Sequence, residues 1–252
     1  MQAIYSAASG LKNQQTRLDT VAANIANSST VGYKSARVDF KDALYTAMDN
    51  PAGSAMDTNL LAGSGVLVGS ISSDFADGAL KDTGSELDFA ISGSGFFTVE
   101  NPDGEILYTR NGSFGTTDAQ DGSYLVTAQG YYVLDSAGNR ISLPKDLAGL
   151  RVTSDGRLST ASGSVAALGI AEFTNPEGLL SVGNTCFQET AASGRSVSTG
   201  QNTSVVQGSL EASNVDMSQE MTLLIRSQRA YSLASKALQT ADDMEGLAND
   251  IH

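Results

Sequence analysis

Cysteine and histidine, two side chains that often carry out enzyme chemistry, are nearly absent from this chain of 252 residues. It has a single cysteine, Cys186, and a single histidine, His252, which is its last residue. A Ser-His-Asp or Cys-His arrangement would need that terminal histidine as its base, and a zinc site would lack ligands, since such sites combine several Cys and His side chains. We therefore expect no catalytic residue, no bound metal and no other cofactor, and one cysteine allows no disulfide within the chain.

Carboxylates are abundant, and such side chains could bind calcium or catalyse glycoside hydrolysis. The segments "NPDGE" (101–105) and "DAQDG" (118–122) weakly resemble calcium loops, but each has too few oxygen ligands, so both are interpreted as hairpin turns. Two of the carboxylates could form the catalytic pair of a glycoside hydrolase, so a carbohydrate-active surface protein is a remote alternative. The chain has no tryptophan on which a sugar ring could stack. The glycine-rich segments "GSGVLVGS" and "SGSGFF" match no phosphate or dinucleotide motif.

The charge and hydropathy of the chain argue against nucleic acid and membrane partners. The formal net charge is −13, and the Lys and Arg residues are scattered rather than clustered. Phosphate binding needs a basic face, and an anionic membrane surface would repel this chain. The N-terminal segment "MQAIYSAASGLKNQQ" has neither a basic region nor an unbroken apolar run, so we expect no cleaved signal peptide and no membrane insertion.

The strongest periodic patterns lie at the two ends of the chain. Apolar residues repeat every seven positions within residues 4–26 and again after Asp216, which has Gln219 three positions later as a capping-box partner. The spacing predicts one long helix over 4–26 and a second over 216–251. We expect a polymerisation interface on these helices, at Ile4, Leu11, Leu18, Ile25, Leu224, Tyr231, Leu238 and Met244.

The middle of the chain consists of short apolar runs separated by turn sequences such as "NPDG", "RNGS" and "TSDG". Turns of the Asn-Gly and Asp-Gly type supply the positive φ angles that hairpins need, and alternation of period two indicates a sheet with one buried face. Strands are predicted at Phe96–Val99, Ile106–Thr109, Tyr124–Thr127, Tyr131–Leu134, Leu150–Thr153 and Ala167–Phe173.

These patterns predict an α+β fold in which both chain ends build one discontinuous, coiled-coil-like helical domain and the middle forms an antiparallel β domain. The expected boundaries are 1–45 and 207–252 for the helical domain, 46–87 and 191–206 for extended Gly/Ser-rich connectors, and 88–190 for the β domain. The periodicity alone equally allows a soluble monomer whose helices pair within one chain. A different surface polymer, such as a tail-tube or adhesin subunit, is a further alternative.

Four motifs in this order resemble those of bacterial flagellar rod and hook axial proteins. The segment "SAASGLKNQQTRLDTVAANIANSSTVGYK" (6–34) resembles their N-terminal signature, "DGALKDTGSELDFAISGSGFFTV" (77–99) and "YTRNGSF" (108–114) their central signature, and "QGSLEASNVDMSQEMTLLIRSQRAYSLASKALQTADDM" (207–244) their C-terminal signature. The motif positions singled out are Asn24, Asn27, Thr30, Gly32, Tyr33, Gln228 and Arg229. Within the family the length and motifs are most similar to the distal rod members, with the proximal rod paralogue or another axial protein as the alternative.

The resemblance implies a structural subunit that polymerises into a helical tube and transmits torque from motor to hook. It implies contacts with identical copies and with other rod and hook proteins, and further contacts with envelope bushing rings, the export apparatus and a rod cap. It also implies a location in the flagellar basal body, outside the cytoplasmic membrane, reached by type III export without a cleaved signal peptide.

Overall fold

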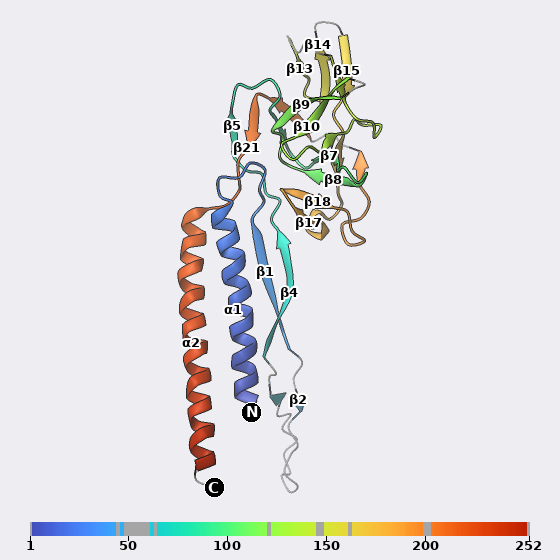
Figure 1. Ribbon diagram of the computed structural model, residues 1–252. Helices are drawn as coiled ribbons and strands as arrows, with labels where there is room; N and C mark the ends of the chain where they lie inside the picture. Colours follow the sequence, from blue (N-terminus) through green and yellow to red (C-terminus); the bar gives the residue numbers. More distant parts are fainter. Residues whose placement is uncertain are drawn as a thin grey trace. The chain divides into compact units, whose positions relative to one another are not determined.

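The computed structural model describes residues 2–43, 46–47, 61–62, 65–119, 122–144, 149–160, 163–198 and 203–250 (Figure 1). Two long helices near the chain ends enclose an antiparallel β region in the sequence, which confirms the predicted α+β class. The chain forms two compact units. The helical unit comprises the described residues within Met1–Ala26, Ala36–Ser72 and Asp216–His252, and the β unit comprises those within Asn27–Ser35 and Ser73–Val215. The boundaries expected from the sequence for domains and connectors remain a prediction.

The helical unit is built on helices α1 (Gln2–Ala26) and α2 (Met217–Asp250), which lie side by side and run in opposite directions (Figure 1). Strand β1 (Ala36–Asp42) packs beside α1 and pairs with β4 (Val66–Ser73), and the short strands β2 (Thr46–Ala47) and β3 (Leu61–Ala62) form an antiparallel pair. Asp216 caps α2 as predicted, because its Oδ1 accepts hydrogen bonds from the backbone N–H groups of Ser218 (2.8 Å) and Gln219 (3.2 Å).

The β unit contains one large sheet whose main path follows the order β12-β10-β11-β7-β8-β18-β17. Its strands are β12 (Ser142–Leu143), β10 (Gly122–Thr127), β11 (Tyr132–Val133), β7 (Phe96–Glu100), β8 (Ile106–Thr109), β18 (Cys186–Gln188) and β17 (Leu180–Gly183). Strand β9 (Phe114–Ala119) pairs with β10, β16 (Ile170–Glu172) pairs with β7, and β19 (Val197–Ser198) pairs with β16.

Smaller sheets complete the β unit. Strands β13 (Arg151–Val152), β14 (Arg157–Thr160) and β15 (Gly163–Ala167) form a three-stranded sheet. Strand β6 (Phe89–Ser92) pairs with β20 (Ser204–Gln207), β5 (Leu80–Asp82) pairs with β21 (Ser209–Glu211), and a 3-10 turn, η1, spans Pro176–Gly178. Each of the six predicted runs overlaps a strand. Strands β5, β6, β9, β12, β14 and those from β17 to β21 were not predicted.

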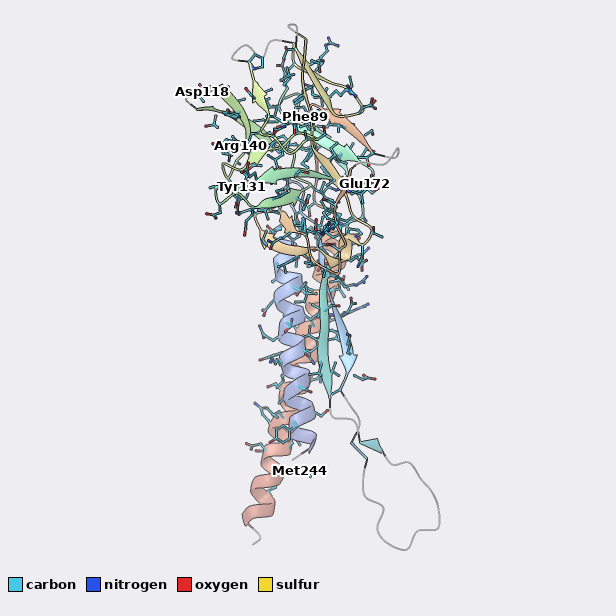
Figure 2. The ribbon with its side chains drawn as sticks, turned by 90° about the vertical axis from the view of Figure 1, so that its right-hand side faces the viewer. Phe89, Asp118, Tyr131, Arg140, Glu172 and Met244 are labelled. Carbon is cyan, nitrogen blue, oxygen red and sulfur yellow. The ribbon has the colours of Figure 1, made fainter. Side chains whose placement is uncertain are left out.

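Turn chemistry and core packing explain why this middle segment folds as a sheet. In "NPDGE", Gly104 has a φ of +85° and the N–H of Asn101 donates to the carbonyl of Glu105 (3.0 Å), which confirms the hairpin interpretation. The core centres on buried side chains such as Phe89, which Figure 2 labels, with Phe97 and Leu125. A second cluster joins four phenylalanines and one tyrosine in edge-to-face pairs: Phe75, Phe96, Tyr108, Phe173 and Phe187.

Candidate functional site

Most of the helix residues expected at the polymerisation interface are half-buried within the helical unit. They are Leu11, Leu18, Ile25, Leu224 and Leu238. Tyr231 is exposed, and Met244 is 67% exposed near the C-terminal end of α2 (Figure 2). The side chain of Ile4 lies outside the described residues. Since α1 and α2 pair within one chain, this heptad pattern already has an intramolecular partner, and its use between chains remains a prediction.

Helix α2 also exposes apolar side chains that the heptad analysis missed. Met217, Met221 and Ile225 follow one another every four residues. The exposed Arg229 occupies the next position of this row and Leu233 the one after it, and Ile225 and Leu233 are 51% and 67% exposed. We call the four apolar residues of this row the apolar ridge. Side chains spaced by four form a ridge that can pack into the groove of another helix, and Met217, Met221 and Ile225 form its uninterrupted apolar part. A search for four-residue as well as seven-residue spacing would have found it.

The family-motif residue Asn24 joins three segments of the helical unit. Its side chain is buried, with 1% exposure. The amide donates to the carbonyl of Ala36 (2.9 Å) and to Oε1 of Glu220 (3.2 Å), and its Oδ1 accepts from the N–H of Ala36 (2.9 Å). Only an amide can donate and accept in this way, so Asn24 holds the end of α1 against the start of β1 and the first turn of α2.

Glu220 carries an unusual carboxylate at this point. Burial raises the pKa of its side chain, the nearby charge of Asp216 raises it further, and the hydrogen bond from Asn24 opposes the shift. Its Oε2 is buried and has no hydrogen-bond partner among the residues that the structure describes. The charged form of Glu220 is therefore less favourable in the folded protein than in the unfolded chain.

A buried cluster of charges lies in the β unit, and we call Lys34, Glu211 and Arg110 the ionic junction. Lys34 Nζ lies 2.6 Å from Glu211 Oε1 and donates to the carbonyl of Ala76 (2.7 Å). Arg110 Nη1 lies 3.4 Å from Glu211 Oε2 and 3.4 Å from Oδ1 of Asp77, whose side chain is half-exposed. The side chains of Lys34, Glu211 and Arg110 are at most 2% exposed.

Backbone groups and an aromatic ring complete the surroundings of the ionic junction. The N–H of Gly78 donates to Glu211 Oε1 (2.8 Å), and Arg110 Nη2 donates to the carbonyl of Gly93 (2.8 Å). The Arg110 guanidinium also stacks over the ring of Phe96, at 5.2 Å from its centroid. Burial lowers the pKa of Lys34, and the hydrogen bond and charge of Glu211 oppose that shift.

Other family-motif residues shape the turn that leads from α1 to Lys34. Thr30 donates its hydroxyl to Oδ1 of Asn27 (3.1 Å). Gly32 has a φ of +67° and donates its N–H to the carbonyl of Glu211 (2.8 Å), and a Cβ at this position would lie 2.5 Å from the backbone nitrogen of Asn111. Glycine is required here for both reasons.

Of the remaining motif residues, Tyr33 belongs to the same turn, where its N–H donates to the carbonyl of Thr30 (3.3 Å). Tyr33 is half-buried in the β unit, while Gln228 and Arg229 are exposed on α2. Sequence reasoning missed Glu211 and Arg110, although both lie within motifs that it quoted. The available signal was a charged residue among the small and polar residues of "QGSLEAS" and of "YTRNGSF".

Three family models match separate segments of the chain. The model described as "Flagella basal body rod protein" matches residues 4–34, that described as "Flagellar hook protein FlgE/F/G D1 domain" matches 90–160, and that described as "Flagellar basal body rod FlgEFG protein C-terminal" matches 206–251.

Curated relatives match the chain over its full length. The flagellar basal-body rod protein FlgG of Borreliella burgdorferi is 37% identical, with 100% of this chain and 98% of the relative covered. The protein of the same name from Agrobacterium fabrum is 38% identical, with 99% of this chain and 98% of the relative covered. The flagellar hook-basal body complex protein FlhP of Bacillus subtilis is 32% identical over 100% and 99%.

The chain belongs to the FlgG family of flagellar basal-body rod proteins. In this member of the FlgG family, each of the three matched segments supplies one residue of the ionic junction: Lys34, Arg110 and Glu211. It is a structural component of the flagellar basal body, and family membership supports its assembly with other rod and hook axial proteins. Within the part of the chain that the structure describes, neither helix is both long and apolar enough to cross a membrane.

Proposed function

We propose that this protein polymerises into the distal part of the flagellar rod and passes torque from the motor to the hook. The observation that carries this proposal is the apolar ridge of α2, in a chain whose relatives are named as basal-body rod proteins. The half-buried heptad residues of α1 and α2 and the exposed Tyr231 and Met244 would contribute to the same contacts between copies.

The energetics of the ridge suit assembly from subunits. Burying one large apolar side chain contributes about 1.5–3 kcal/mol, so four ridge residues can offset much of the entropy lost when copies associate. A contact that repeats from copy to copy without closing produces a helical filament rather than a small ring. Because every copy would have the same ridge, the same favourable contact would form between each pair of neighbouring copies in the rod.

Further partners follow from the family and belong to the proposal. We infer that the subunit contacts the neighbouring rod and hook proteins, passes through the flagellar export apparatus without a cleaved signal peptide and assembles beneath a rod cap. Its working location would be outside the cytoplasmic membrane, where bushing rings of the envelope surround the rod. No chemical reaction is part of this function.

The experiment places a charge on the ridge. The full-length Ile225→Glu variant should keep its melting temperature, because the side chain is already half in solvent, but it should neither polymerise in vitro nor restore swimming to a strain that lacks the protein. Thr116→Glu adds the same charge at an exposed position of β9 and should assemble normally. Normal polymers of Ile225→Glu would overturn the role of the ridge.

A further inference from the structure

The ionic junction lies where the chain enters and leaves the β unit. Lys34 follows α1, which ends at Ala26, and Glu211 precedes α2, which begins at Met217. Strand β21, which carries Glu211, pairs with β5 in a separate two-stranded ladder in which Glu211 lies opposite Leu80 and Ser209 lies opposite Asp82. The register of this short ladder therefore determines where the chain leaves the β unit for α2.

Apolar packing within the β5–β21 ladder itself does little to fix that register, although β20, one residue before β21, pairs with β6 around the buried Val205 and Ile91. All three residues of β5 are exposed, and β21 offers two buried side chains, Ser209 and Glu211, on either side of the half-buried Leu210. Strand register is specified strongly where an apolar face is buried and only weakly in short polar strands. Neither strand presents a buried apolar side chain that would distinguish one register from the next.

The buried charges do distinguish the registers. A slip of one residue would turn Glu211 to the opposite face of the ladder, whereas a slip of two would bring Ser209 or Ser213 into its place. In either case Lys34 and Arg110 would remain beside each other without the carboxylate that now contacts both. An unpaired buried charge is strongly unfavourable, while a satisfied buried ion pair is about as stable as apolar side chains of the same size.

We propose that Glu211, held between Lys34 and Arg110, sets the register of β21 on β5, and that the ionic junction provides this specificity rather than stability. A two-residue slip would shift the start of α2 along the chain path by about 7 Å, since strands rise about 3.4 Å per residue. If the proposed rod function holds, copies in different registers would join β21 to α2 through connecting segments of different length.

The test replaces the ionic junction by apolar side chains of similar size and then measures the register. In the full-length protein, the triple variant Lys34→Met, Arg110→Met, Glu211→Leu is combined with one of two cysteine pairs. The pair Asp82→Cys with Ser209→Cys reports the native register, and Leu80→Cys with Ser209→Cys reports a two-residue slip. Burial raises the pKa of Cys186 to about 11, so the native thiol should not compete in oxidation.

With the ionic junction intact, only the native pair should form a disulfide. In the triple variant, the melting temperature should stay within a few degrees of the parent value while the slipped pair also forms a disulfide in a substantial fraction of molecules. Replacing the partly exposed pair Arg140 and Glu100 by Met and Leu serves as the matched control and should leave the native register unchanged.

Two results would overturn the inference. Exclusive formation of the native disulfide in the triple variant would show that other contacts set the register, and failure of that variant to fold would show that the charges provide stability instead. Both measurements use unassembled protein. They can therefore succeed or fail independently of the Ile225→Glu assembly experiment.

Discussion

Removal of the Asn24 side chain should destabilise the helical unit by an amount that the structure allows us to bound. Asn24→Ala leaves the N–H and the carbonyl of Ala36 without their side-chain partner, and it also removes the donor to Glu220. A buried polar group that loses its partner costs about 1–3 kcal/mol, so two such groups would cost about 2–6 kcal/mol, and because Ala36 is only half-buried we expect a loss near the lower end of that range. Since single domains are typically stable by about 5–15 kcal/mol, this loss is large.

Urea denaturation followed by circular dichroism at 222 nm would measure the effect, because both long helices lie in the helical unit. Gln15→Ala is the matched control on α1, where one exposed side-chain bond to Asp19 (2.9 Å) is lost and the expected cost is below about 0.5 kcal/mol. Asn24→Asp should also be destabilising at neutral pH, since a carboxylate cannot donate to Ala36 or to Glu220. Equal stabilities for Asn24→Ala and Gln15→Ala would refute the reasoning.

Two other predictions concern pH and backbone conformation. The raised pKa of Glu220 means that the folded protein binds this proton more tightly than the unfolded chain, so its contribution is complete below pH 4.5 and is lost as pH rises through the folded-state pKa. In Glu220→Gln, the free energy of unfolding measured with urea should therefore vary less between pH 4 and 8, and it should be higher than that of the parent protein at pH 7. An unchanged pH profile would show that Glu220 is not the group responsible. Gly32→Ala should cost more than the roughly 1–2 kcal/mol of a left-handed residue, because its Cβ meets Asn111. Gly84→Ala is the control, because Gly84 has a φ of +72° but an added Cβ would meet no atom within 4 Å. If thermal melting shows equal losses of stability for the two variants, the contact with Asn111 contributes nothing.

The sequence was sufficient to predict those elements whose signals are local. Helix α2 was recognisable from its heptad spacing and from Asp216, whose cap depends on atoms within three residues. The hairpin at 101–105 was likewise predictable, because Asn and Gly at fixed positions determine its turn.

The ionic junction could not be predicted because its signal is not local. Lys34 and Glu211 are separated by 177 positions, and an isolated charge in a sequence ordinarily indicates solvent exposure. The apolar ridge was missed for a different reason. The seven-residue spacing predicted residues that are mostly half-buried in the helical unit. Met221 and Ile225 follow a four-residue spacing instead and are exposed.

The origin of the three junction charges in three separately matched segments has a consequence for engineering chimeras. A hybrid that exchanges only the C-terminal segment with a distant homologue would retain Lys34 and Arg110 but import whatever side chain the donor has at position 211. Such grafts should be chosen by the compatibility of these three positions as a set. Overall percentage identity would be a poor guide to which hybrids yield straight, working rods.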